Sequence, residues 1–168
     1  MLGEVTEVNE DGHVQVRGIL TMTETNRFYR AESVLFKLDR MGQRFHSLEE
    51  MQDYVDQTLE RWYRETKVWR QVKVTLNRRA KRVALARLRD FTIIIPARRD
   101  TRFHYFWTEY LLLHELAHLL GNTVSHQLHY RETLCRLLDL AGLSSEKQIL
   151  MDSVMQHGMQ MPWSKSND

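Results

Sequence analysis

One segment constrains the fold of this chain more than any other, because residues 106–120 are strongly apolar yet contain two histidines and two glutamates. Apolar residues on all sides of this segment predict a buried helix that ends at Gly121. Burying His114, Glu115 and His118 without partners would leave unpaired polar groups, which costs free energy. The fold must therefore supply these three side chains with hydrogen-bond partners or with a ligand.

The three polar residues form a recognisable motif, because His114-Glu115-Leu116-Ala117-His118 matches the metal-binding signature H-E-x-x-H. Residues four apart lie on the same face of an α-helix, about one turn apart, so both imidazoles can bind one ion. The adjacent Glu115 then lies beside the metal, where its carboxylate can act on a bound water. The motif therefore predicts a metal site, with Zn²⁺ as the expected ion.

A hydrolytic zinc site needs a third protein ligand and an open position for water. Two histidines follow His118 after a short break in the helical pattern. We favour His126, because it stands at the start of the next expected helix and nearest the break. His129, one turn later, is the alternative, and Glu132 is the best placed carboxylate.

Other residues near the motif are weaker candidates for a role in the site. The longer metzincin pattern H-E-x-x-H-x-x-G-x-x-H is excluded, because its last position falls on Val124. Tyr130 and Arg131 lie next to the candidate ligands and are candidates for stabilising an oxyanion, although Tyr130 equally fits a core position. Cys135 lies among leucines and is expected to be a small core residue.

The rest of the chain predicts helices packed on a small antiparallel sheet. A capping box at Ser47 and Glu50 begins a helix over residues 48–62. Residues 91–95 are continuously apolar and β-branched, which is typical of a central strand. The remaining expected helices cover residues 23–40, 125–141 and 145–157, and the remaining expected strands cover residues 72–76 and 83–88.

The length of 168 residues fits one domain. Weak alternation around Asp11-Gly12 predicts a hairpin, so residues 1–22 are expected to be an N-terminal extension or hairpin. The domain then spans residues 23–159, with a frayed tail at 160–168. A single cysteine cannot form an internal disulfide, and no secretory signal or membrane span is visible, which together predict a cytoplasmic protein.

Charge is unevenly distributed along the chain. Residues 67–102 contain twelve Lys and Arg against two Asp, a net charge of +10, whereas the remainder carries −8. Such a segment suits a surface that meets phosphates, and weak, sequence-independent binding to nucleic acid is one expectation. An ordinary solvated strand face is the other. The candidate contacts are Arg78, Arg79, Lys81 and Arg82.

Several stretches within residues 25–157 match a known pattern. They are Tyr29-Arg30-Ala31-Glu32, Tyr54-Val55-Asp56, the stretch from Leu112 to His118, and His126-Gln127-Leu128-His129-Tyr130-Arg131. On these residues the chain resembles the small H-E-x-x-H metallohydrolases of actinobacteria and their phages, and more distantly the SprT-like zincins. The family has His-Gly-x-x-Phe-Arg after the motif, so Gln127 and Tyr130 are departures. The resemblance places the third ligand on His126 and implies an α+β, zincin-like minidomain with zinc-dependent hydrolysis.

These observations lead to a functional expectation and a rival. The expected function is that of a zinc metallopeptidase, in which Glu115 takes a proton from the zinc-bound water and returns it to the leaving amine. A peptide substrate would add as a strand to an edge of the sheet. The rival is a nucleic-acid-associated module with a structural zinc, which a closed site using both His126 and His129 would favour. A SprT-like peptidase acting on DNA-bound proteins would combine the two.

Overall fold

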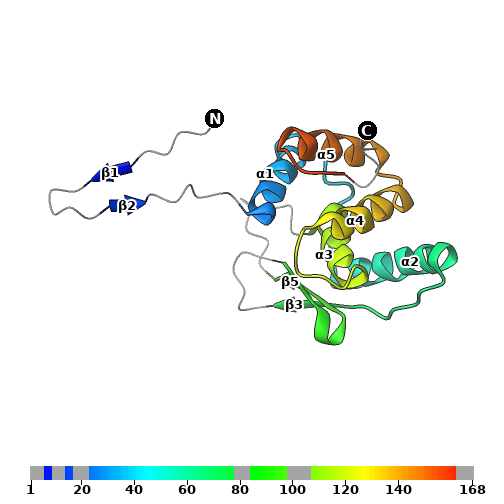
Figure 1. Ribbon diagram of the computed structural model, residues 1–168. Coiled ribbons are helices and arrows are strands. Elements are labelled where there is room, and N and C mark those ends of the chain that lie inside the picture. The colour runs from blue at the N-terminus through cyan, green and yellow to red at the C-terminus, as the bar shows by residue number, and fades with distance from the viewer. Residues whose placement is uncertain (1–5, 9–13, 17–22, 78–83, 98–106, 162–168) are drawn as a thin grey trace.

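The computed structural model describes residues 6–8, 14–16, 23–77, 84–97 and 107–161 (Figure 1). Its helices and small sheet confirm the predicted α+β class. The helices are α1 (Glu24–Lys37), α2 (Leu48–Thr66), α3 (Glu109–Leu120), α4 (Leu128–Leu140) and α5 (Ser144–Gln156), with a short 3-10 helix η1 (Leu88–Asp90). The strands are β1 (Thr6–Val8), β2 (Val14–Val16), β3 (Lys73–Asn77), β4 (Leu85–Arg87) and β5 (Thr92–Pro96).

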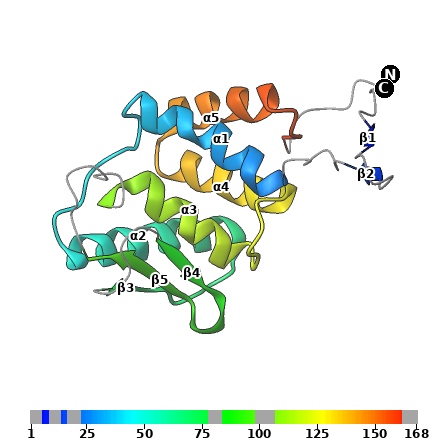
Figure 2. The same ribbon diagram turned by 90° about the vertical axis from the view of Figure 1, so that its left-hand side faces the viewer.

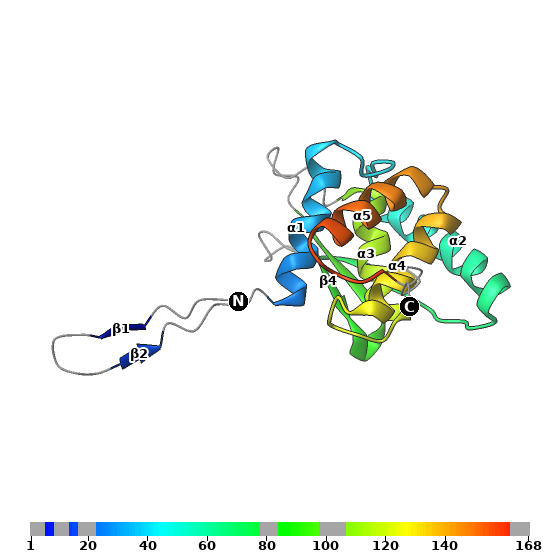
Figure 3. The ribbon, with the colours of Figure 1, turned by 45° about the horizontal axis from the view of Figure 1, so that its top comes forward.

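Helix α3 occupies the centre of the fold. Figure 2 shows it between the sheet and helix α4, and Figure 3 shows α1 and α5 side by side beyond them. Residues 109–119 of α3 are all buried, as the apolar character of this segment predicts. The H-E-x-x-H residues therefore lie inside the domain, against both the sheet and the other helices. Among the described residues, no helix combines the length and apolarity that crossing a bilayer requires.

The three-stranded sheet has the order β3-β5-β4, which confirms the central position of the strand at residues 92–96. The prediction of an antiparallel sheet is wrong, because β3 and β5 are parallel and only β4 and β5 are antiparallel. The cause is the placement of β5 between the two earlier strands. The chain reverses twice between β3 and β5, so the two strands point the same way. Alternation within a strand carries no information on this order.

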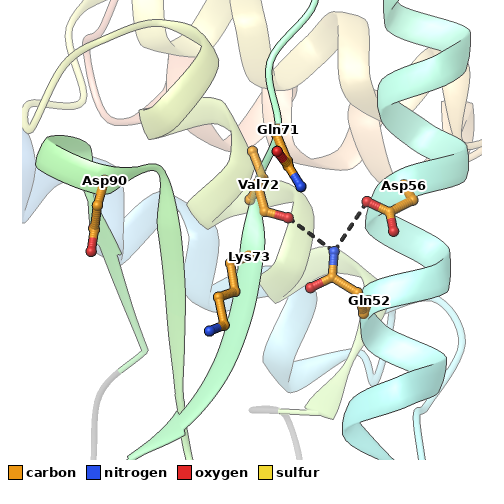
Figure 4. A pocket seen from close by; sticks show the side chains of 6 residues that line it. All are labelled: Gln52, Asp56, Gln71, Val72, Lys73 and Asp90. Carbon is orange, nitrogen blue, oxygen red and sulfur yellow. Dashed lines mark hydrogen bonds between the residues drawn. The ribbon is translucent and has the colours of Figure 1, made fainter.

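The two edges of the sheet differ, and Figure 4 shows the hydrogen bonds of Gln52 beside β3. At β3, the side-chain amide of Gln52 from α2 takes the place of a neighbouring strand. Its Oε1 accepts a hydrogen bond from the Val74 backbone N–H at 2.8 Å, and its Nε2 donates to the Val72 carbonyl at 2.9 Å. Asp56 accepts a second hydrogen bond from the same Nε2 at 3.0 Å. The opposite edge, β4, packs beside α3.

Helix boundaries follow the predicted caps in part. The Ser47 hydroxyl accepts from the Glu50 N–H at 3.0 Å, which confirms one half of the capping box, whereas the Glu50 carboxylate accepts from the His46 N–H at 2.7 Å rather than from Ser47. Helix α3 ends at Gly121 as expected, but Gly121 has a φ of −77°, and Asn122 supplies the left-handed residue instead. Helix α4 begins at Leu128 rather than at residue 125, because the Ser125 hydroxyl contacts Thr123 instead of capping the helix.

Two short strands lie on either side of the predicted N-terminal turn. Strands β1 and β2 pair antiparallel, with Thr6 opposite Val16 and Val8 opposite Val14. The turn around Asp11-Gly12 lies outside the described residues.

Candidate metal centre

Three histidines from two parts of the chain meet beside helix α3. His114 and His118 lie one turn apart on this helix, and His126 comes from the irregular segment between α3 and α4. One ring nitrogen of each residue lies within 4.8 Å of the corresponding nitrogen of the other two. The Nε2 atoms of His114 and His126 are 3.3 Å apart. The late start of α4 leaves His126 outside the helix, where it can turn toward the other two rings.

The first two histidines are oriented by acceptors behind their rings. Nδ1 of His114 lies 2.6 Å from Oε1 of Glu32 on α1, and Nδ1 of His118 lies 2.8 Å from the carbonyl oxygen of Thr123. Because a carboxylate or carbonyl oxygen can only accept, each Nδ1 must carry the hydrogen. The lone pair of a neutral ring is then on Nε2, which is the arrangement seen in metal-binding histidines.

His126 is held by its backbone and by ring stacking. Nη1 of the buried Arg131 donates to the His126 carbonyl and to Glu24, each at 2.7 Å. The ring stacks on Phe28 with centroids 4.9 Å apart. Its Nδ1 is buried and has no hydrogen-bond partner among the described residues. A buried nitrogen without a partner costs free energy, and a metal bound at Nε2, the nitrogen that faces His114, would leave this cost in place.

The pKa values of His118 and His126 disfavour protonation of these two rings, whereas that of His114 is shifted the other way. Burial, with the neighbouring His114, lowers the pKa of His118 to about 4 and that of His126 to about 2. For His114 burial also lowers the pKa, but the charge and hydrogen bond of Glu32 outweigh it and the net shift is upward. His118 and His126 are therefore neutral near pH 7, which is the form that binds metal. The three histidines can together hold a metal ion.

Glu115 lies beside this cluster without belonging to it. Its carboxylate is buried, and it lines a cavity of about 150 Å³ together with the three histidines. Burial raises the pKa of Glu115, while His114 and a hydrogen bond from the Ala86 backbone lower it, and the net shift is upward. A carboxylate with a raised pKa next to a metal site is suited to accepting and returning a proton.

The walls of the cavity come from four parts of the fold. Helix α1 contributes Tyr29, and helix α3 contributes Glu115 and two histidines. The remaining lining residues are Ala84, Leu85 and Ala86 at β4, and Thr123, Val124 and His126 after α3. The site thus opens between the sheet edge β4 and the segment that carries the third histidine.

The alternative third ligands lie away from the cluster. The side chain of His129 is 70% exposed, and that of Glu132 is 47% exposed. They approach each other at 4.0 Å and neither lines the cavity. His126, which the sequence favours, is the one that the structure brings to His114 and His118.

Tyr130 and Arg131, the candidates for stabilising an oxyanion, do not line the cavity. The Tyr130 hydroxyl donates to the backbone carbonyl of His114 at 3.3 Å, and its ring packs beneath the histidines in the core. Arg131 is occupied by Glu24 and the His126 carbonyl. Both residues therefore support the site from behind. Four predicted nucleic-acid contacts lie outside the described residues, namely Arg78, Arg79, Lys81 and Arg82.

Three residues of the site were not assigned a role from the sequence: Tyr29, Glu32 and Thr123. Glu32 had a usable signal, because it lies on the same helical face as the apolar residues Phe28 and Leu35, where an unpaired carboxylate would be costly. Thr123 acts through its backbone carbonyl, so its residue type carries no signal. Tyr29 is half exposed and stands over His126, with ring centroids 4.7 Å apart.

Comparison with known proteins adds little to this description. No model of a known protein family matches the chain, and no curated protein matches it either. Among solved structures, the chain is similar to the crystal structure of the metallopeptidase zymogen of Pyrococcus abyssi abylysin. The TM-score is 0.40 and the sequence identity is 19%, over 68% of this chain and 99% of the other. A likeness of this size assigns neither a family nor an activity.

Proposed function

We propose that the protein is a zinc-dependent hydrolase, and specifically a metallopeptidase. One observation carries the proposal: three buried imidazoles converge on one point, with the Glu115 carboxylate beside them in the same cavity. Three neutral nitrogen donors form a ligand set that suits Zn²⁺ and leaves a fourth position open. The zincin-like architecture implied by the sequence resemblance is consistent with this site.

The residues around the cavity have separate roles in the proposed reaction. His114, His118 and His126 would hold the zinc, which supplies Lewis-acid polarisation and a water of lowered pKa. Glu115 accepts the proton of the attacking water and returns it to the leaving amine. Burial and the nearby carboxylates of Glu32 and Glu115 raise the pKa of Tyr29, so its hydroxyl stays protonated at the cavity wall as a donor.

The two sheet edges suggest where a peptide would bind. Gln52 already occupies the Val72 carbonyl and the Val74 N–H at the start of the β3 edge, so a peptide strand would have to displace it there. Strand β4 lines the cavity through Leu85 and Ala86, and the Ala86 backbone hydrogen-bonds to Glu115. A peptide that added to this edge would therefore run past the histidines and Glu115.

The rival reading, a structural zinc site, would need a fourth protein ligand. Among the described residues, the metal-binding cluster contains only the three histidines, and His129 is largely exposed away from them. This open arrangement favours catalysis over a purely structural role.

The test compares wild type with Glu115→Gln for zinc content and for hydrolysis of a mixed peptide library. We expect about one zinc per chain in both proteins, and a loss of hydrolysis of roughly 10²- to 10⁴-fold in the variant, as is typical when a general base is removed. Glu132→Gln is the matched control and should keep both properties. A wild-type protein that binds zinc but cleaves no peptide would contradict the peptidase assignment, and loss of zinc in Glu115→Gln would make Glu115 a ligand.

A further inference from the structure

Three exposed apolar side chains surround the mouth of the cavity. Tyr29 on α1 is 49% exposed, Leu85 on β4 is 54% exposed, and Val124 after α3 is 80% exposed. All three line the same cavity although they come from three separate parts of the chain. We call these residues the apolar rim.

Single exposed apolar residues are common on protein surfaces and need no explanation. The apolar rim differs because its members converge on one cavity that also contains the candidate metal ligands. Other exposed apolar residues, such as Leu38 and Met155, do not line it. An apolar surface gathered at a site is typical of a place where an apolar group of a ligand is buried.

Within the part of the chain that the structure describes, the remaining wall has no group that would select a charged side chain. Apart from Glu115 and the histidines, the lining residues in the described part of the chain are Tyr29, Ala84, Leu85, Ala86, Thr123 and Val124, all uncharged. Glu115 is needed for proton transfer and would repel an acidic substrate.

The size of the cavity also limits what can enter. Its volume of about 150 Å³ is well below the roughly 300–1,000 Å³ of pockets that enclose a whole small-molecule ligand. It fits the reacting group and one neighbouring side chain of a longer substrate.

We propose that the apolar rim makes the site select peptides that carry an apolar side chain next to the scissile bond. This inference rests on the proposed peptidase function, and it assigns the substrate class of the same site. Burying one aliphatic side chain against the rim favours such a peptide over a charged one by about 10- to 200-fold.

The test uses matched peptides that differ only at the two positions flanking the scissile bond, with Leu, Phe, Lys or Asp. Zinc-loaded wild type is assayed for cleavage, and zinc-loaded Glu115→Gln is assayed for binding by fluorescence anisotropy. We expect the Leu and Phe peptides to be cleaved, and bound by the inactive variant, at least about tenfold better than the Lys and Asp peptides. Equal binding of all four peptides, or tighter binding of a charged one, would overturn the proposal.

Substitution of the rim sharpens this test. Leu85→Lys and Val124→Lys change exposed side chains, so both variants should fold and keep zinc. Each should lose most of the preference for Leu and Phe peptides and improve binding of the Asp peptide. Met155→Lys alters a similarly exposed residue on α5 and should leave the preference intact. An unchanged preference in both rim variants would contradict the rim assignment.

The binding assay with Glu115→Gln separates the peptidase proposal from the apolar-rim proposal. If wild type cleaves none of the four peptides but Glu115→Gln still binds the apolar ones preferentially, the peptidase assignment fails while the apolar rim stands. If all four are cleaved and bound equally, the peptidase assignment stands and the rim assignment fails.

Discussion

Helix α3 carries two buried polar clusters, and they differ in what they leave unsatisfied. At the N-terminal end, both carboxylate oxygens of Glu109 accept hydrogen bonds, one from the Tyr54 hydroxyl at 2.7 Å and one from the Gln43 N–H at 2.9 Å. Burial and the hydrogen bond to Glu109 raise the pKa of Tyr54, so its hydroxyl stays protonated and can donate. The cluster is complete without any further component.

The cluster around the three histidines is incomplete, because the protein itself does not satisfy its inner ring nitrogens. Glu32 and Thr123 occupy the outer nitrogens of His114 and His118, and the inner nitrogens of all three rings face one another. The comparison teaches that burial of polar residues alone does not mark a functional site. What marks it is a set of buried acceptors that converge and that the protein does not itself satisfy. The predictions below follow from this difference.

The largest expected effect is the loss of a ligand. His126→Ala should weaken zinc binding by about 1,000-fold, since each of three or four ligands contributes a similar share of a typical zinc binding energy of about 10–16 kcal/mol. His129→Ala should leave the affinity within about twofold. Competition with a chromophoric chelator measures both. If His129→Ala had the larger effect, the third ligand would be His129, and if neither variant lost affinity, Glu132 would be the next candidate.

Loss of Glu109 from the complete cluster should have the opposite result: it should lower stability and leave zinc binding unchanged. Glu109→Ala leaves the partly buried Tyr54 hydroxyl and the Gln43 N–H without their acceptor, so we expect the free energy of unfolding to fall by about 1–3 kcal/mol. Zinc affinity should change little. Urea unfolding and a zinc titration of the same variant test both statements. A variant of normal stability that has lost zinc would break the distinction between the two clusters.

We expect a loss of zinc affinity of intermediate size when Glu32, the hydrogen-bond partner of the ligand His114, is changed. Glu32→Gln removes the charge that orients His114, and loss of such an outer partner typically weakens metal affinity by about 10- to 100-fold. The helical fold, measured by circular dichroism, should be retained. Glu49→Gln, an exposed carboxylate in the first turn of α2, is the control and should have no effect on zinc. Equal zinc affinity in the two variants would remove Glu32 from the site.

The smallest effect is expected at Cys135, a buried group of α4 that belongs to neither cluster. Burial raises the pKa of this thiol to about 12, so almost no reactive thiolate forms in the folded protein below about pH 10. Alkylation at pH 8.5 should be slow in the native protein and fast in urea. Cys135→Ala should keep full zinc affinity. Rapid native labelling that zinc prevents would instead indicate a sulfur ligand.

The sequence predicts the helices and the motif because these depend on local spacing. The periodic leucines locate α3, the Ser47 and Glu50 pair locates the start of α2, and the four-residue spacing brings His114 and His118 together. Local sequence patterns do not predict contacts between residues that are far apart in the chain. Whether β5 lies between β3 and β4 depends on packing of whole strands, and the match of Glu32 to His114 joins residues 82 positions apart.

The choice between His126 and His129 shows the same limit. Both residues follow the break after α3, and the sequence favours His126 only by its nearness to that break. In the structure, α4 begins at Leu128, so His129 belongs to the helix and is exposed, while His126 remains in the segment that returns to α3. The hydrogen bond between Ser125 and Thr123, which replaces a helix cap, has no signature in the spacing of apolar residues.

X-ray absorption at the zinc edge tests the central claim most directly, on the full chain loaded with one equivalent of zinc. We expect three imidazole nitrogens at about 2.0–2.1 Å and one further oxygen ligand. His126→Ala should lose one imidazole contribution, and His129→Ala should give the wild-type spectrum. Four imidazoles, a sulfur ligand, or a protein that takes up no zinc would contradict the account.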